Sequence, residues 1–110
     1  MKSHTLKQNK DFRRLYYRGK TKASSCLVTY IMKNRLGETR IGITSGKKVG
    51  NAVRRNRSRR LIRAAFSCCE DRLNGSYDIV FVARTRTADA KMQQVREQME
   101  EQLAKLGAID

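Results

Sequence analysis

The sequence has no proline, no tryptophan, one histidine and only three cysteines among its 110 residues. Two of the cysteines, Cys68 and Cys69, are adjacent, so they do not form the framework of a disulfide-rich secreted domain and are typical of a reduced, intracellular chain. The longest apolar runs, at residues 79–83 and 64–66, are far shorter than the about 20 residues that span a bilayer. The N-terminus offers no apolar segment for a signal peptide. These absences exclude transmembrane, collagen-like and disulfide-rich secreted classes, and we expect a cytoplasmic protein.

Acidic residues are also scarce: 10 Asp and Glu against 25 Lys and Arg give a formal net charge of +15. Residues 1–63 carry 19 basic side chains and two acidic ones, Asp11 and Glu38, whereas residues 64–110 carry six basic and eight acidic side chains. A fold with this asymmetry has a strongly positive face, which attracts a polyanion, most often nucleic acid. A surface that serves only solubility does not need the asymmetry. A membrane partner is not expected, because a membrane-binding helix needs exposed apolar anchors opposite its charges.

Hydrophobic periodicity predicts one domain over residues 1–110 with helices at residues 10–18, 52–73 and 88–106. Asn9 and Asn51 are predicted N-caps, and Gly19, Gly75 and Gly107 are predicted to end the helices in the left-handed backbone conformation. The third helix is expected to bury one stripe of apolar side chains, which comprises Met92, Val95, Met99, Leu103 and Leu106.

Strands are predicted at residues 25–32, 39–45 and 77–83, and residues 20–23 fit an additional short strand. The first strand alternates, with Val28 and Tyr30 on one face and Leu27 and Thr29 on the other. Residues 77–83 form a continuous apolar run, which is typical of a buried central strand. A long helix between two strands suggests a parallel β–α–β crossover within a mixed sheet, and therefore an α+β fold.

Six arginines fall within residues 54–63, and they surround most of this half of the helix. Asn56, Arg60 and Arg63 share one face. Neighbouring like charges cost helix stability unless an anion neutralises them, and guanidinium groups bind phosphate oxygens in pairs. Lys47, Lys48 and the helix N-terminus add affinity for anions. The alternative is a solvated basic helix end; the pattern favours nucleic-acid binding without showing which nucleic acid.

Phe12 and Tyr16 lie four residues apart on the first helix, and Tyr30 lies on a strand that can face them. Such aromatic side chains provide stacking surfaces for a single-stranded nucleic acid; the alternative is ordinary packing between helix and sheet. The small residues Gly42 and Thr44 either leave room for a nucleic-acid strand or lie beneath a helix.

The sequence offers no convincing catalytic or metal-binding set. His4 is the only histidine, and the cysteines lack the spacing of a zinc site. Glu97, Glu100 and Glu101 are predicted to lie on the solvent face of the last helix rather than to form a catalytic pair.

The order of residues in three segments closely resembles the bacterial ribonuclease P protein subunit. The most specific segment is Lys47-Lys-Val-Gly-Asn-Ala-Val53, followed by Arg55-Asn-Arg57, Arg59-Arg60 and Arg63. Residues 6–16 with Gly19 resemble the family's opening helix, and residues 77–84 resemble its central strand. The resemblance covers about residues 6–106, with small departures at Gly46, Arg59 and Ala64.

The resemblance implies a subunit without catalytic residues, because in this family the RNA subunit cleaves precursor tRNA to form the mature 5′ end. Mg²⁺ is then bound mainly by the RNA, with no metal site or tightly bound cofactor in the protein. The fold implied is a mixed sheet of about four strands in α-β-β-β-α-β-α order with a rare left-handed β–α–β crossover (ribosomal protein S5 domain 2-like), and the isolated protein is expected to be a monomer. Residues expected to bind the catalytic RNA are Lys47, Lys48, Asn51, Arg55, Asn56, Arg57, Arg59, Arg60 and Arg63. Residues expected to line a cleft for the 5′ leader of precursor tRNA are Phe12, Arg13, Tyr16, Val28, Tyr30 and Thr44.

Two other classes fit the composition. A structural RNA-binding protein, such as a small ribosomal protein, would have the same charge but would lack the ordered pattern at residues 55–63 and the strand at residues 77–84. A DNA-binding protein with residues 52–73 as its recognition helix would need a compact helical motif with a short turn, and strands flank this helix instead.

Overall fold

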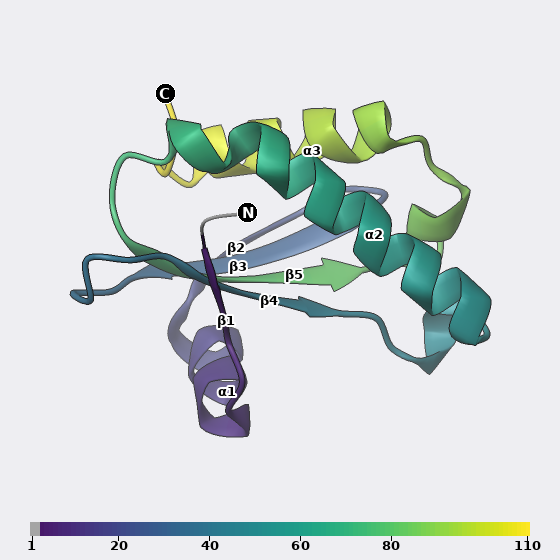
Figure 1. Cartoon of the computed structure of the whole chain (residues 1–110), viewed down its shortest axis with the longest axis horizontal. Helices are drawn as coiled ribbons and strands as arrows, with labels where there is room; N and C mark the ends of the chain where they lie inside the picture. Colours follow the sequence, from purple (N-terminus) through teal and green to yellow (C-terminus); the bar gives the residue numbers. More distant parts are fainter. Residues whose placement is uncertain (1–2) are drawn as a thin grey trace.

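The computed structural model describes residues 3–110, which form a mixed sheet with two long helices on one face and a shorter helix on the other (Figure 1). The five strands lie in the order β1-β4-β5-β3-β2. The helices are α1 (Asn9–Arg18), α2 (Ala52–Cys69) and α3 (Met92–Lys105), and the strands are β1 (His4–Thr5), β2 (Lys20–Ala23), β3 (Leu27–Lys33), β4 (Arg40–Thr44) and β5 (Tyr77–Ala83).

The central strand β5 is parallel to β4 and antiparallel to β3. The chain leaves β4, crosses above the sheet through α2 and returns along β5 behind β4, which makes the crossover left-handed (Figure 1). The short strand β2 pairs antiparallel with β3, as the sequence allowed. The parallel pair β1–β4 adds a fifth strand that was not predicted, because two residues are too few to carry an alternation pattern.

The main core lies between the sheet and the pair of helices α2 and α3. The predicted alternation of β3 is confirmed, because Leu27 and Ile31 are buried in this core while Tyr30 packs on the α1 side. Strand β5 is buried on both faces, with Phe81 on the α2 side and Val80 beneath α1. The C-terminal half of α2 is amphipathic, with Ile62, Phe66 and Cys69 fully buried after the arginine-rich N-terminal half.

The boundaries of α2 and α3 differ from those predicted. Helix α2 ends at Cys69 and continues only as a 3₁₀ turn at Glu70–Arg72. Helix α3 begins at Met92 rather than residue 88, because Thr87 accepts a hydrogen bond from the Arg84 backbone N–H and donates one to the Cys26 carbonyl (2.6 Å), which holds Thr87–Asp89 in a separate 3₁₀ turn. Met92 is therefore 36% exposed, and the buried stripe begins at Val95.

The predicted helix ends were partly right. Asn51 caps α2 by accepting a hydrogen bond from the Arg54 backbone N–H (3.0 Å), and Gly107 has a φ of +81° after α3. For α1, the predicted end at Arg18 is confirmed, but the predictions for the two flanking cap residues were wrong. Its first residue is Asn9, preceded by Gln8 without a side-chain cap, and Gly19 has a φ of −69°. Gly19 is needed for space instead, because an added Cβ would lie 2.5 Å from the Leu15 carbonyl oxygen.

Candidate nucleic-acid interface

A buried ionic cluster joins α1 to the sheet. The Asp78 side chain, at the start of β5, is only 2% exposed and accepts two hydrogen bonds from Arg40, at 2.9 and 2.7 Å. It also accepts hydrogen bonds from Asn34 in the β3–β4 turn (2.9 Å) and from Arg14 in α1 (3.2 Å). Arg14 donates a further hydrogen bond to Asp11 on its own helix (3.1 Å). One carboxylate therefore connects α1, β4, β5 and the β3–β4 turn.

The charges within this cluster stabilise one another. Burial on its own would raise the pKa of Asp78, but hydrogen bonds from Arg40 and Asn34 and the charges of Arg40 and Arg14 outweigh it, so the pKa lies below its ordinary value. The pKa of Arg40 is raised, chiefly by its hydrogen bonds to Asp78. Both groups are therefore ionised at neutral pH.

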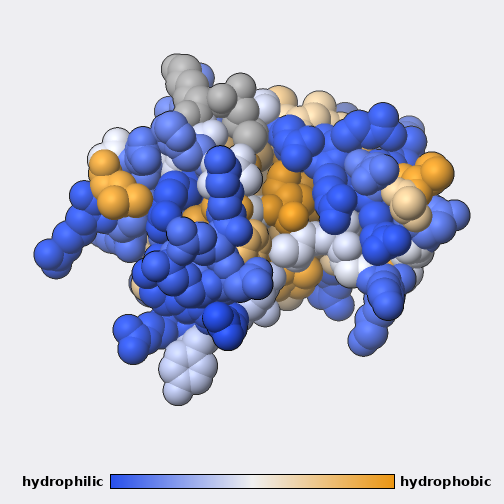
Figure 2. All heavy atoms as spheres, turned by 60° about the horizontal axis from the view of Figure 1, so that its bottom comes forward, coloured by the Kyte–Doolittle hydropathy of each residue, from blue (hydrophilic) through white to orange (hydrophobic). Residues whose placement is uncertain are grey.

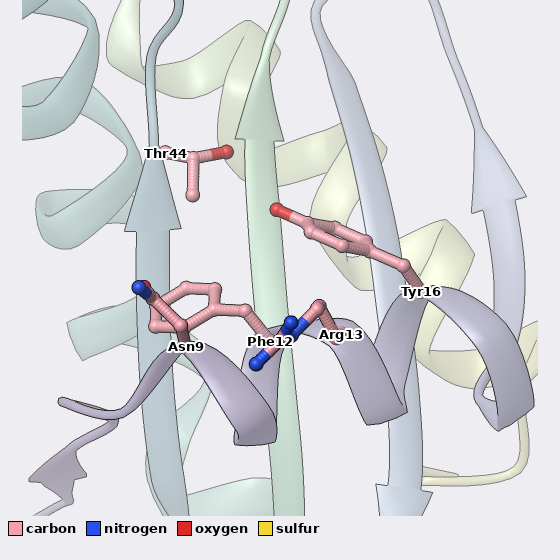
Figure 3. Close-up of a pocket in the computed structure, with 5 residues that line it drawn as sticks. All are labelled: Asn9, Phe12, Arg13, Tyr16 and Thr44. Carbon is pink, nitrogen blue, oxygen red and sulfur yellow. The ribbon is translucent and has the colours of Figure 1, made fainter.

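The cluster holds α1 beside a hollow of about 470 Å³ that Asn9, Phe12, Arg13, Tyr16 and Thr44 line. Figure 3 shows the Phe12 and Tyr16 side chains reaching from α1 over the sheet, with the Tyr16 hydroxyl directed toward Thr44. Four of these residues were predicted from the sequence. Asn9 was considered only as a cap, although its spacing from Phe12, Arg13 and Tyr16 places all four on one helix face.

The two other predicted cleft residues, Tyr30 and Val28, do not line this hollow but lie on the same face of the sheet. The Tyr30 ring packs edge-on against Tyr16, with centroids 4.9 Å apart. Thr44, Val82 and Val28 are partners in one row across β4, β5 and β3, so Val28 lies on the same sheet face as Thr44. The structure thus places four of the six predicted cleft residues at the hollow, with Tyr30 in contact with Tyr16 and Val28 further along the same sheet face.

Phe12 also has a packing role. An added Cβ at Gly42 would lie 2.6 Å from the Phe12 ring, so the absent side chain of Gly42 makes space for that ring. Gly42 therefore lies beneath the helix, whereas Thr44 lines the open hollow. Tyr16 is the more accessible aromatic side chain, with 44% of its surface exposed.

The outer face of α2 carries a second hollow, of about 550 Å³, lined by Asn56, Arg59, Arg60, Arg63 and Val53. The predicted shared face of Asn56, Arg60 and Arg63 is consistent with this hollow. Val53 was not predicted, although it lies three residues before Asn56 and is 72% exposed. Lys47 and Lys48 are exposed on the 3₁₀ turn before α2.

The remaining arginines of the segment face the protein to different degrees. Arg54 forms an ion pair with Asp89 (2.9 Å) and donates to the Val49 and Thr85 carbonyls. Arg57 is exposed but donates through Nε to the Ala88 carbonyl (2.7 Å). The Arg55 side chain, expected to bind the catalytic RNA, is partly buried, and its Nε lies inside the protein without a hydrogen-bond partner.

The aromatic hollow and the arginine face of α2 meet at the edge of β4. A smaller hollow there is lined by Phe12 on one side and Arg63 on the other, with Gly42 and Ile43 between them. Figure 2 views the molecule from the α1 side and shows hydrophilic surface over α1 and a band of hydrophobic surface beside it. The two predicted surfaces therefore lie on opposite faces of the sheet but are neighbours at this small hollow.

Two acidic side chains of α3 and the Cys69 thiol have structural surroundings rather than catalytic ones. Glu100 pairs with Arg96 (2.7 Å) and Glu101 with Lys105 (2.8 Å) on α3. Burial raises the pKa of the Cys69 thiol to about 11, which keeps it protonated and a poor nucleophile. Within residues 3–110 no group of three His, Cys, Asp or Glu side chains is placed to hold a metal ion, and no helix is long and apolar enough to cross a membrane.

The fold and these surfaces define a class of small basic α+β proteins with an aromatic hollow on one sheet face and an arginine-rich helix on the other. The model of the Ribonuclease P family matches residues 1–107, and the chain belongs to this family. A ribonuclease P protein component from Clostridioides difficile strain 630 is 44% identical over 91 residues, which are 82% of this chain and 80% of the relative. One from Clostridium botulinum strain Loch Maree is 38% identical over 108 residues, 97% of both chains.

Solved structures agree with this membership. The structure of the Staphylococcus aureus RNase P protein superposes with a TM-score of 0.85 at 32% identity, covering 99% of this chain and 100% of that one. The RNase P protein from Thermotoga maritima gives a TM-score of 0.77 at 26% identity, with 89% and 93% covered. The first of these superpositions covers nearly the whole described fold.

Proposed function

We propose that this chain is the protein subunit of a bacterial ribonuclease P, which binds the catalytic RNA and the 5′ leader of precursor tRNA. In this assignment the RNA subunit carries out the hydrolysis that forms the mature tRNA 5′ end, and the protein contributes binding and positioning. The observation that carries the proposal is the meeting of an aromatic hollow with an arginine-rich helix in a chain of the Ribonuclease P family. A small ribosomal protein is not favoured, since the named relatives are ribonuclease P components.

The surface proposed to bind the catalytic RNA is centred on the outer face of α2. Asn56, Arg60 and Arg63 are exposed side by side, and no carboxylate lines their hollow. Each guanidinium can donate two hydrogen bonds to one phosphate group. The whole proposed set is Lys47, Lys48, Asn51, Arg55, Asn56, Arg57, Arg59, Arg60 and Arg63; of these, Asn51 also caps α2 and Arg55 is partly buried.

The surface proposed to bind the leader is the hollow between α1 and the sheet. Leaders differ in sequence, so a protein that serves many precursors gains more from stacking than from reading base edges, and an aromatic platform accepts any base. Tyr16 and Phe12 offer such a platform, and Arg13 supplies a cation for the backbone phosphates. Val28, Tyr30 and Thr44 complete the proposed set on the sheet side.

The chemistry of the reaction is assigned to the RNA. Mg²⁺ is the metal proposed for the holoenzyme, but the described residues offer no cluster of acidic ligands for it, so the proposal places it on the RNA and gives the protein no tightly bound cofactor. The protein on its own is proposed to be a monomer, and the proposed site of action is the cytoplasm, where precursor tRNA is the substrate.

The assignment is tested by reconstitution. Purified protein is mixed with bacterial ribonuclease P RNA at a low Mg²⁺ concentration, and cleavage of precursor tRNA is followed with and without the protein. We expect cleavage at the mature 5′ end to depend on the protein. A matched control replaces Asn56, Arg60 and Arg63 with Ala, which should remove the stimulation while the protein remains folded. If the rate is the same with and without protein, the assignment is wrong.

A further inference from the structure

The roll and distance of α1 on the sheet decide where the Phe12 and Tyr16 rings lie. This helix has ten residues, and only Asp11 and Leu15 are buried. The apolar packing of Leu15 and Phe12 holds α1 on the sheet but gives less control of its orientation, because the hydrophobic effect is non-directional. The ionic cluster, in contrast, is directional, since hydrogen bonds weaken steeply when they depart from linearity.

Within that cluster, Asp78 is the group to which the other members are tied. Its two oxygens accept hydrogen bonds from Arg14, Arg40 and Asn34, which lie 64, 38 and 44 residues away in the sequence. Arg14 connects this carboxylate to α1 and also donates to Asp11 one turn earlier on the same helix. Asp78 is almost completely buried, so it cannot itself contact RNA.

The geometry points to Asp78 as a positioning residue for leader binding, acting through Arg14 and Arg40 to hold α1 where Tyr16 and Phe12 face Thr44. This inference rests on the proposed function, because it concerns the same hollow. Tyr16 lies two residues after Arg14 on a helix of 3.6 residues per turn, so a change in the roll of α1 moves the Tyr16 ring away from Tyr30 and Thr44. Misplacement by about 1 Å is enough to weaken such an arrangement considerably.

The key variant is Arg14→Gln. It cuts the link between Asp78 and α1 but leaves Asp78 paired with Arg40 and Asn34, and the Arg14 side chain is already 42% exposed, so the fold should tolerate the change. The matched control is Arg18→Gln, which removes the same charge from the exposed last turn of α1 outside the cluster. Arg14→Lys keeps a positive charge for Asp78 and should restore part of the effect.

The readout is the ratio of the holoenzyme's dissociation constants for mature and precursor tRNA. Arg14→Gln should lower this ratio by about tenfold, whereas Arg18→Gln should leave it nearly unchanged, and affinity of the protein for the catalytic RNA alone should be the same in both. Asp78→Asn should have the same effect, and adding Arg14→Gln to it should cost less than Arg14→Gln alone, because coupled residues are not additive.

Equal weakening for both tRNAs, or additive effects of the two substitutions, would overturn the inference and indicate that Arg14 contacts RNA directly. If Asp78→Asn does not fold, the same double-mutant cycle with Asp11→Asn, the other carboxylate that Arg14 contacts, decides the question. Absence of any precursor preference in the wild-type holoenzyme would instead contradict the proposed function, which keeps the two failures distinct.

Discussion

Gly19 and Gly42 are required for the space they leave rather than for backbone freedom. Gly19 allows the chain to turn closely past the end of α1, and Gly42 allows one edge of the Phe12 ring to approach β4 closely. Sequence patterns identify a glycine after a helix as an expected left-handed residue. They cannot reveal a close approach to the Leu15 carbonyl or to the Phe12 ring, because that contact exists only in the folded chain.

Replacing Gly19 with alanine should destabilise the protein, because the new Cβ would meet a backbone oxygen that cannot move freely. Overpacking of this kind costs about 1–3 kcal/mol. Gly46→Ala is the matched control, since its Cβ would have open space within 4 Å and its φ of −81° suits any residue. Urea unfolding of both variants measures the difference; equal stability of the two would contradict the close approach at Gly19.

Arg54 and Arg60 should behave oppositely although they lie on one helix. Arg54→Ala should lower the melting temperature, because it removes the pair with Asp89 and the hydrogen bonds to the Val49 and Thr85 carbonyls. Arg60→Ala should leave the melting temperature unchanged or raise it, by relieving repulsion, while weakening binding to the catalytic RNA. Thermal melts and RNA titrations of the two proteins check this; a destabilised Arg60→Ala protein would mean that its exposed position is misassigned.

At the scale of helices and strands, sequence patterns correctly predicted the features that depend on interactions between residues close in the sequence. The cap of α2 by Asn51, the buried half of that helix and the alternation of β3 depend on neighbours in the sequence and were correct. The start of α3 was not, because Thr87 is held by partners that include the distant Cys26 carbonyl. The ionic cluster under α1 was also missed, since its members become neighbours only when the sheet forms.

The face of α2 was predicted in outline but not in detail. Helical periodicity correctly grouped Asn56, Arg60 and Arg63, which line the hollow on the outer face of α2. It could not separate Arg54 and Arg57, whose carbonyl and carboxylate partners come from the segment between β5 and α3. Four of the six residues predicted for the leader cleft line the hollow, and the additional packing role of Phe12 depends on the position of Gly42.

The basic surface of α2 should make binding to the catalytic RNA strongly salt-dependent. If about six phosphates are neutralised, the logarithm of the binding constant should fall against the logarithm of salt concentration with a slope near −4 to −5. Filter-binding titrations at several KCl concentrations measure this slope. A slope shallower than about −2 would mean that few arginines contact phosphates.

The stabilisation that Asp78 provides between α1 and the sheet should depend on pH. Because folding lowers the pKa of Asp78, its ionised form stabilises the native state above the unfolded pKa of about 3.9, and this stabilisation is lost as the pH falls below that value through the lower folded pKa. The difference in free energy of unfolding between wild type and Asp78→Asn should be constant near neutral pH and shrink below about pH 4. Urea unfolding at a series of pH values tests this; a difference that grows in acid would contradict the sign.

At the scale of the whole molecule, the left-handed crossover places the arginine-rich helix α2 above β4, on the opposite side of this strand from the aromatic hollow beside α1. Residues from α1, β4 and α2 therefore line one small hollow, which includes Phe12 and Arg63. An RNA that binds α2 and an RNA strand in the hollow would be neighbours. This arrangement is the structural basis for proposing one protein that holds the catalytic RNA and the substrate leader together.

The proposal that this hollow receives the leader is tested most directly by binding measurements. The dissociation constants of the holoenzyme for precursor tRNA and for mature tRNA are compared between wild-type and variant proteins. Tyr16→Ala should weaken binding of precursor tRNA about ten- to a hundredfold, since stacking is worth roughly 1–3 kcal/mol per base. Phe12→Ala should act in the same direction, with an added loss of stability from its contact at Gly42. Tyr16→Phe keeps the ring and should bind nearly as wild type, and mature tRNA should be bound equally by all of them. Equal losses for precursor and mature tRNA in Tyr16→Ala would show that the hollow does not hold the leader.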